Sequence, residues 1–323
     1  MNLYHLRVFL TVAEHEHITR ASEELILSQP AVTKIIQNLE HEVGLELIER
    51  HGRRIVLTHA GHLLHRYARR MFALEREMEE ALSALKDIES GEITLAANTT
   101  TGVYLLPPIV ARFRARYPQV TLHINILNSH EIVEQILNWN LDFGLVESDP
   151  ATLPPGLQVE VFAYDELVMV VAPRHRWSQL DSLEPEALRN EELVLREQGS
   201  GIREVIEHAL FQHGVQVSPL LTIPDNEAIK QMVMSGVGAA ILSRLTVQRE
   251  LAAGNLVHIP INGMELHPQL SLIRRTDKQL SRAAQAFCAL LKPPDKEIPE
   301  LQQATEIAKD NEVEQAYKTT GKP

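Results

Sequence analysis

Residues 18–44 alternate apolar and polar positions with the period of two short helices joined by a tight turn. Ser28 can cap the second helix through its hydroxyl, and Pro30 falls in the first turn, where a missing N–H costs nothing. Gly44 follows the last periodic position, as expected of a residue that ends a helix. One apolar stripe results, made of Val32, Ile35, Ile36, Leu39 and Val43.

A further helix precedes this pair, and a hairpin follows it. Asn2 can cap the first helix, whereas Thr19 is the candidate cap of the second. The segments 45–50 and 53–57 favour short strands joined around Gly52, which supplies a permissive turn. The pattern therefore predicts an N-terminal winged helix-turn-helix domain over 1–58, with the helix-turn-helix at about 18–37.

Thr58 can cap a long helix over 59–89 that serves as a linker. Its apolar residues are separated by alternating steps of three and four, the heptad pattern of a coiled coil. Histidines 59, 62 and 65 recur in its first turns, but they drift around the helix without an acidic or thiol partner, so no metal site is predicted. The expected dimerisation residues are Leu64, Tyr67, Met71, Leu74, Met78 and Leu85.

Beyond residue 90 the chain changes to alternating strands and helices, which is typical of a parallel α/β sheet. The order predicts a two-lobed α/β domain over 90–292, of the periplasmic-binding-protein type. Lobe I takes about 90–160 and 268–292, lobe II takes about 163–266, and the crossings lie near 160–165 and 262–269. The polar segment 293–323 has too few apolar residues to pack and is expected to be a disordered tail.

Composition narrows the function only in part. The net charge is −12, and residues 1–58 hold six Lys and Arg against eight Glu, so gross charge argues against nucleic acid. Phosphate contacts need local cations, however, and Arg50, Arg53 and Arg54 cluster in the wing. A single cysteine, Cys288, excludes an intramolecular disulfide, and no signal peptide or apolar span is seen, so we expect a cytoplasmic protein without a membrane segment.

The arrangement resembles the LysR-type transcriptional regulators over roughly residues 1–292. The resemblance is carried by TRASEELILSQPAVTKIIQNLEHEVGLELIER at 19–50, by LTHAG at 57–61, by LLPP at 105–108 and by SGVG at 235–238. Two departures are small, because Thr33 stands where the family more often has serine, and Ile48 replaces a frequent phenylalanine.

The family's DNA contacts map onto the second helix and the wing. Gln29 and Gln37 could bind adenine, Thr33 a thymine methyl, and Lys34 a guanine or a phosphate. The DNA-binding residues that the resemblance and the wing arginines imply are Ser28, Gln29, Pro30, Ala31, Thr33, Lys34, Gln37, Arg50, Arg53 and Arg54.

Two strand-to-helix loops offer a second site. Hydroxyls and free N–H groups in 98–102 and 198–201 could hold an anion, although plain helix capping would explain either loop alone. The family places its effector between the lobes, so a small, anionic metabolite of unknown identity is implied and no cofactor. The residues carried over are Thr99, Thr100, Thr101, Ser129, Ser200, Gly201 and Arg203.

The reading favoured is a sequence-specific regulator, an activator or a repressor, that binds double-stranded DNA as a homodimer or homotetramer and responds to the effector. RNA polymerase is a further candidate partner. The alternative is a cytosolic small-molecule-binding protein or an enzyme built on the α/β lobes. The sequence shows no GxSxG, GxxxxGK[ST] or HExxH signature, so catalysis is not expected. An architectural DNA protein would leave some 200 residues of sensor domain unexplained.

Overall fold

The computed structural model describes residues 2–51, 54–83, 91–147, 152–217, 219–264 and 266–291. The chain divides into two compact units, Met1–Leu82 with Asn138–Asn140, and Ser83–Leu137 with Leu141–Pro323. We call them the N-terminal and the C-terminal unit. No helix in the described ranges is long and apolar enough to cross a membrane.

The N-terminal unit is a winged three-helix domain. Asn2 Oδ1 accepts the Tyr4 N–H, and Gly44 ends the third helix at φ 76°, so both predicted end residues are confirmed. The second helix is capped by His17 Nδ1 rather than by Thr19, because the helix begins two residues earlier than expected. The elements are α1 (Leu3–His15), α2 (Ile18–Glu24), α3 (Gln29–Val43), β1 (Ile48–His51) and the antiparallel β2 (Arg54–Leu57).

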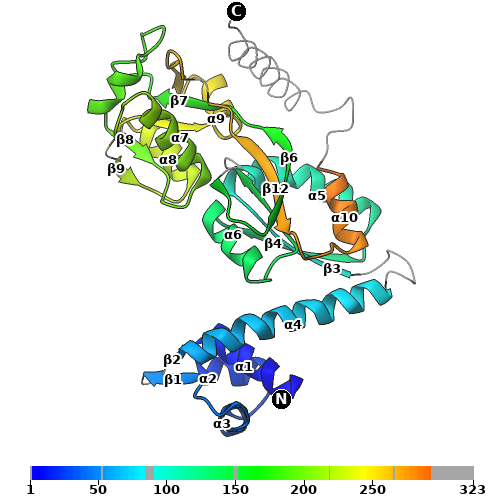
Figure 1. The fold of residues 1–323 in the computed structure, drawn as a ribbon. Helices are drawn as coiled ribbons and strands as arrows, with labels where there is room; N and C mark the ends of the chain where they lie inside the picture. Colours follow the sequence, from blue (N-terminus) through cyan, green and yellow to red (C-terminus); the bar gives the residue numbers. More distant parts are fainter. Residues whose placement is uncertain are drawn as a thin grey trace, which may run out of the picture. The chain divides into compact units, whose positions relative to one another are not determined.

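The long helix α4 (His59–Ser83) follows the wing in Figure 1. Thr58 Oγ1 accepts the Gly61 N–H, as predicted. One side of α4 packs on the core of the winged three-helix domain, which we call the head, through Leu64, Ala68 and Phe72. This second apolar stripe was not predicted, because the heptad reading assigned Leu64 to the exposed seam and left Phe72 out.

A five-stranded sheet forms the first lobe of the C-terminal unit, in the order β4-β3-β5-β12-β6. Strand β3 runs parallel to β4 and β5, whereas β12 is antiparallel to β5 and β6. Helices α5 and α10 cover one face and α6 the other (Figure 1). The bounds are β3 (Gly91–Ala97), η1 (Thr101–Leu105), α5 (Leu106–Arg116), β4 (Val120–Ile126), α6 (Ser129–Leu137), β5 (Phe143–Glu147), β6 (Leu157–Tyr164), β12 (Gln269–Arg275) and α10 (Arg282–Ala289).

The second lobe has a core of its own around Trp177, Ile206 and Ile241. Strands β10 and β11 flank β7 in antiparallel pairing, and β8 pairs with β9 in parallel. The bounds are β7 (Leu167–Val171), η3 (Pro185–Asn190), β8 (Leu193–Leu195), α7 (Gly201–Gln212), β9 (Pro219–Thr222), α8 (Asn226–Met234), β10 (Ala240–Ser243), α9 (Arg244–Ala252) and β11 (Val257–His258).

The chain passes between the lobes twice, and the two passages are hydrogen-bonded to each other. The Asp165 N–H donates to the Pro268 carbonyl over 3.0 Å, and the Leu167 N–H to the Leu266 carbonyl over 2.9 Å. The bond between Asp165 and Pro268 lies within the predicted crossings, whereas Leu167 lies two residues beyond the first of them. The predicted fold class is confirmed. The stated domain limits stay predictions. Arg53, Leu85 and the tail 293–323 lie outside the described residues.

Candidate functional site

Helix α3 presents a polar face to solvent along the N-terminal unit. Ser28 Oγ accepts the Ala31 N–H over 3.3 Å, which caps the helix. Val32, Ile36 and Leu39 are fully buried, so the opposite side of the helix must face outward. Of the predicted DNA contacts on this side, Ser28, Gln29, Pro30, Lys34 and Gln37 are exposed, whereas Ala31 and Thr33 are half-buried.

The wing places its arginines beside this helix, but not as free cations. Arg50 Nη2 donates to Thr33 Oγ1 over 3.5 Å, which ties β1 to α3. Arg54 forms an ion pair with Glu16 at 2.6 Å. Both contacts are exposed, so phosphates could replace them at little cost. Arg53 lies outside the described residues.

The other side of α4 is apolar and exposed. Tyr67, Leu74 and Met78 are each more than half exposed, at 63%, 62% and 56%. Met71 is 38% exposed, and the neighbouring Leu82 is 57% exposed. At the foot of the helix a groove of about 690 Å³ is lined by Val43, Leu45, Leu47, Ala60, Leu63, Leu64, Tyr67, Arg70, Met71 and Leu74. Leaving this much apolar surface in water is unfavourable.

The histidines at the start of α4 do not converge. Arg69 Nε donates to His65 Nε2 over 3.2 Å. Burial, with the positive charge of Arg69 next, lowers the pKa of His65 to about 4. His65 is therefore a neutral acceptor for Arg69. Within the described ranges, no three His, Cys, Asp or Glu side chains are grouped so that they could hold a metal ion.

In the C-terminal unit, the loop after β3 is organised by Asn98. Its Oδ1 accepts the Thr101 N–H over 2.9 Å, which starts the π-helical turn η1. Thr100 and Thr101 are each 1% exposed, and both hydroxyls lack a hydrogen-bond partner in the described part of the chain. Thr99 is half-buried. Buried hydroxyls without partners are costly, and π-turns are frequent at functional sites.

Ser129 and Gly201 meet at the backbone carbonyl of Glu147, the last residue of β5. Ser129 Oγ donates to this oxygen over 3.3 Å, and a Cβ on Gly201 would lie only 1.6 Å from it. The His130 N–H also donates to the Gly199 carbonyl over 3.0 Å. The first turn of α7 therefore packs against the ends of β5 and α6. Ser200, at 4% exposure, makes no capping hydrogen bond there.

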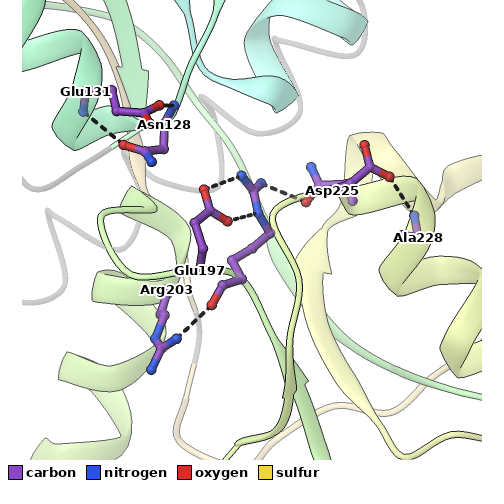
Figure 2. Close-up of polar contacts among 8 residues, drawn as sticks. Asn128, Glu131, Glu197, Arg203, Asp225 and Ala228 are labelled. Carbon is purple, nitrogen blue, oxygen red and sulfur yellow. Dashed lines mark hydrogen bonds and ion pairs between the residues drawn. The ribbon is translucent and has the colours of Figure 1, made fainter. Parts of the chain in front are cut away.

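Arg203 is turned away from this junction. Its guanidinium donates to Glu207 over 2.7 Å. It also donates to the carbonyl oxygen of Arg196 over 2.9 Å (Figure 2). Arg196 itself is 6% exposed, and its side chain binds both oxygens of Glu197 and the Asn226 Oδ1. Arg203 is the cation expected from the sequence, but it is Arg196 whose charge acts on Glu147. Burial raises the pKa of Glu147 well above its ordinary value, and the charge of Arg196 opposes this.

Helix starts around the junction are fixed by short-range caps (Figure 2). Asn128 and Glu131 form a reciprocal capping box, with bonds of 2.9 and 3.0 Å between each side chain and the other backbone N–H. Asp225 Oδ1 accepts the Ala228 N–H over 2.7 Å and caps α8. These caps hold the loops in place.

Asn98, Glu147, Asp165 and Arg196 were missed by the sequence analysis. Three of them stand directly at the end of an apolar strand, where a polar residue marks the carboxyl edge of a sheet. That position was the available signal. Nothing local indicated that all four would be buried together.

Two family models match the chain. The model described as bacterial regulatory helix-turn-helix protein, lysR family, matches residues 3–62, and the LysR substrate binding domain model matches residues 86–293. The chain belongs to the LysR family. The resemblance stated from the sequence is thereby confirmed, and this LysR regulator is a DNA-binding transcriptional regulator with an effector-binding domain.

Similar proteins agree with this assignment. The RuBisCO operon transcriptional regulator of Allochromatium vinosum is 35% identical to the LysR regulator over 287 residues, 89% of this chain and 94% of the relative. The structure of full-length CbnR complexed with its target DNA is 27% identical, with a TM-score of 0.63, and the match covers 90% of this chain and 99% of CbnR. The regulatory domain of Synechocystis PCC6803 CcmR, in complex with 2-PG, is 28% identical, with a TM-score of 0.58, covering 62% of this chain and 96% of that domain.

Proposed function

We propose that this LysR regulator binds promoter DNA as a homodimer and that a small anionic metabolite, held at the ends of β3 and β5, changes its DNA binding. The observation that carries the effector half of this proposal is the pair of buried, unpartnered hydroxyls of Thr100 and Thr101. They stand at the start of η1, where N–H groups point toward the loop and favour negative charge.

The DNA half rests on α3. Gln29, Lys34 and Gln37 are exposed on the side opposite the buried stripe, so a major groove could accept them without any rearrangement of the head. Arg50 and Arg54 would exchange their exposed partners Thr33 and Glu16 for phosphates. The CbnR complex with its target DNA supports this placement by similarity.

A second copy of the chain is the proposed occupant of the apolar face of α4. Tyr67, Met71, Leu74 and Met78 follow the predicted heptad and are exposed together, so pairing of two such helices would remove them from water. The groove beside them would receive side chains of the partner helix. A tetramer, contact with RNA polymerase and a cytoplasmic location stay predictions.

The metabolite class and the target genes are proposed from relatives. The CcmR domain was solved with 2-PG, which is 2-phosphoglycolate, and the Allochromatium relative is named for the RuBisCO operon. We propose phosphorylated or carboxylated metabolites of carbon assimilation as effectors, and an operon of carbon assimilation as the target.

Two measurements on the full chain test the proposal. Labelled fragments of the promoter next to its own gene should be bound selectively over unrelated DNA of equal length. A thermal-shift series with 2-phosphoglycolate, phosphate and sulfate should show stabilisation, about 2.7 kcal/mol at one hundred times the dissociation constant. Binding without sequence preference would contradict the DNA half, and no stabilisation by any anion of the class would contradict the effector half.

A further inference from the structure

Both passages between the lobes meet at one buried point. Asp165 stands in the first passage and is bonded through its N–H to Pro268 in the second. Glu147, at the end of β5, pairs with Leu270 of β12, where the second passage enters the sheet of the first lobe. The hinge between the lobes therefore runs past the Glu147 and Asp165 side chains.

These two carboxyl groups are buried against each other. Glu147 is 0% and Asp165 2% exposed, and no hydrogen bond of good geometry reaches Glu147 Oε1 or Asp165 Oδ2 from the described residues. Two ionised carboxylates would repel each other here and leave both acceptors without a donor. One proton between them would remove both penalties.

Titration of the pair agrees with this geometry. Burial, and next the charge of Asp165, raise the pKa of Glu147 well above its ordinary value. Burial also raises the pKa of Asp165 to about 6, against the opposing effects of Ser243, the Glu166 amide and Glu147 itself. The two groups titrate as a unit, so a proton that the pair retains belongs to both carboxyl groups.

Among the described residues, Asn98 connects the pair to the loop 98–101, which we call the effector loop. Asn98 Nδ2 donates to Glu147 Oε2 over 3.2 Å, and Asn98 Oδ1 accepts the Thr101 N–H over 2.9 Å. The amide nitrogen of Asn98 therefore binds Glu147, while its amide oxygen fixes the first turn of η1. A change in the charge of Glu147 acts directly on the bond that positions the Thr100 and Thr101 loop.

Other charges around the pair are already neutralised. Arg196 acts on Glu147 but is paired with Glu197 at 2.8 Å. Glu166, beside Asp165, is bound by Arg244 at 2.8 Å, and burial with the charge of Arg244 lowers the pKa of the nearby His258. No further cation among the residues acting on the pair is left to replace the proton.

We propose that Glu147 is a positioning residue that carries a proton shared with Asp165, and that this proton holds the inter-lobe hinge and the effector loop together. Loss of the proton loosens the hinge. An effector anion beside Thr100 and Thr101 draws a proton from solvent onto the pair, because a pair with one more proton carries less negative charge and repels the anion less. The second half rests on the proposed effector site, whereas the hinge itself does not.

Hydrogen exchange in the full chain tests the hinge without any ligand. After correction for intrinsic rates, the Asp165 and Leu167 amides should lose about tenfold in protection between about pH 6.5 and about pH 9. Glu147→Gln should abolish this pH dependence, because its amide donates a hydrogen at every pH. Glu134→Gln, which removes an exposed carboxyl on α6, should leave it unchanged. If Glu147→Gln does not fold, Asp165→Asn gives the same comparison.

Equal protection of both amides at the two pH values in the wild type would overturn the proposal, as would an unchanged pH dependence in Glu147→Gln. A second arm adds 2-phosphoglycolate and counts protons by calorimetry in buffers of different ionisation enthalpy. Wild type should take up more protons than Glu147→Gln, and equal uptake would overturn the coupling to the effector. Failure of the anion to bind at all would overturn the proposed effector function and leave the hinge result standing.

Discussion

The head and the effector domain hold their candidate site residues in opposite ways. On α3, Gln29, Lys34 and Gln37 stand in solvent on a single helix face. In the effector domain, Thr100 and Thr101 are 1% exposed, and the other buried candidates Ser129 and Gly201 come from the separate helices α6 and α7. DNA is a large ligand and is bound by side chains that are already exposed on the protein surface. A small anion makes few contacts, so it must be enclosed to be bound tightly.

The largest expected difference in stability between the head and the effector domain comes from a substitution of Gly201. A Cβ there would lie 1.6 Å from the Glu147 carbonyl oxygen and 2.8 Å from Ser129 Oγ. We expect Gly201→Ala to destabilise the effector domain by about 3 kcal/mol, because backbone atoms must move, and to leave the head unchanged. Denaturant unfolding followed by hydrogen exchange separates the two units. Ser200→Ala is the control, since Ser200 makes no capping hydrogen bond. Equal loss of protection in both units would contradict the separation.

The proposed self-association uses the exposed apolar face of α4 and no residue of the effector domain. Leu74 is 62% exposed on the apolar face of α4. Leu74→Glu should raise the dimer dissociation constant by about a hundredfold, since a charge would have to be buried in the paired interface. Arg76→Glu adds negative charge on roughly the opposite side of the same helix and should have little effect. Sedimentation velocity measures both, and a stable dimer of the Leu74 variant would refute the proposed interface.

Two kinds of contact should contribute to DNA binding: contacts with bases, which set sequence preference, and contacts with phosphates, which do not. Gln29→Ala is expected to weaken binding to the cognate promoter by about tenfold and to relax preference at one base pair. Lys34→Ala should weaken all DNA alike and reduce the salt slope by about one if it binds a phosphate. Fluorescence anisotropy at several salt concentrations tests both variants. His41→Ala, exposed in the last turn of α3, serves as the control. Uniform loss in the Gln29 variant would argue against base reading.

The two units should respond to pH in opposite directions. The folded head holds the pKa of His65 at about 4, below its ordinary value, so the unfolded state binds more protons and head stability rises between about pH 4 and 6.5. The folded effector domain raises the pKa of Asp165 to about 6 and that of Glu147 well above its ordinary value. It therefore binds more protons than the unfolded state, and its stability falls as pH rises above about 4. His65→Gln and Glu147→Gln should each flatten only their own unit's slope in thermal scans. Parallel slopes in wild type, unchanged by both variants, would contradict these assignments.

Local patterns in the sequence predicted most helix ends of the head, although the cap of α2 is His17 and not Thr19. Asn2, Ser28, Thr58 and Gly44 stand at helix ends as predicted, since capping depends on residues within one turn. The heptad on α4 was also visible, but the contact of Phe72 with the head was not. Helix α4 has one apolar stripe that packs on the head and a second that is exposed. The two stripes overlap in the sequence, so the heptad pattern alone could not separate them.

The sequence indicated which loops form the candidate effector site, but it did not indicate which charged residues lie there. Thr100, Thr101, Ser129 and Gly201 follow strands or begin helices, which spacing reveals. Spacing could not show that Arg203 would bind the Arg196 carbonyl, or that Glu147 and Asp165 would be buried in contact. Those facts depend on two passages between lobes that bring residues about 100 positions apart together, such as Asp165 and Pro268.

If the anion site and the DNA-binding face are coupled, anion binding must change the affinity of the protein for DNA, and a titration measures this directly. Full-length protein on its labelled promoter is titrated with 2-phosphoglycolate and with other small phosphorylated and carboxylated anions. At least one should change the DNA dissociation constant by about fivefold or more. Thr101→Val should abolish this change in DNA affinity without loss of stability, because the Thr101 hydroxyl has no hydrogen-bond partner among the described residues. The control Thr121→Val, at an exposed position of β4, should leave the change in DNA affinity intact. An anion that stabilises the effector domain yet leaves DNA affinity and promoter geometry unchanged would contradict the account.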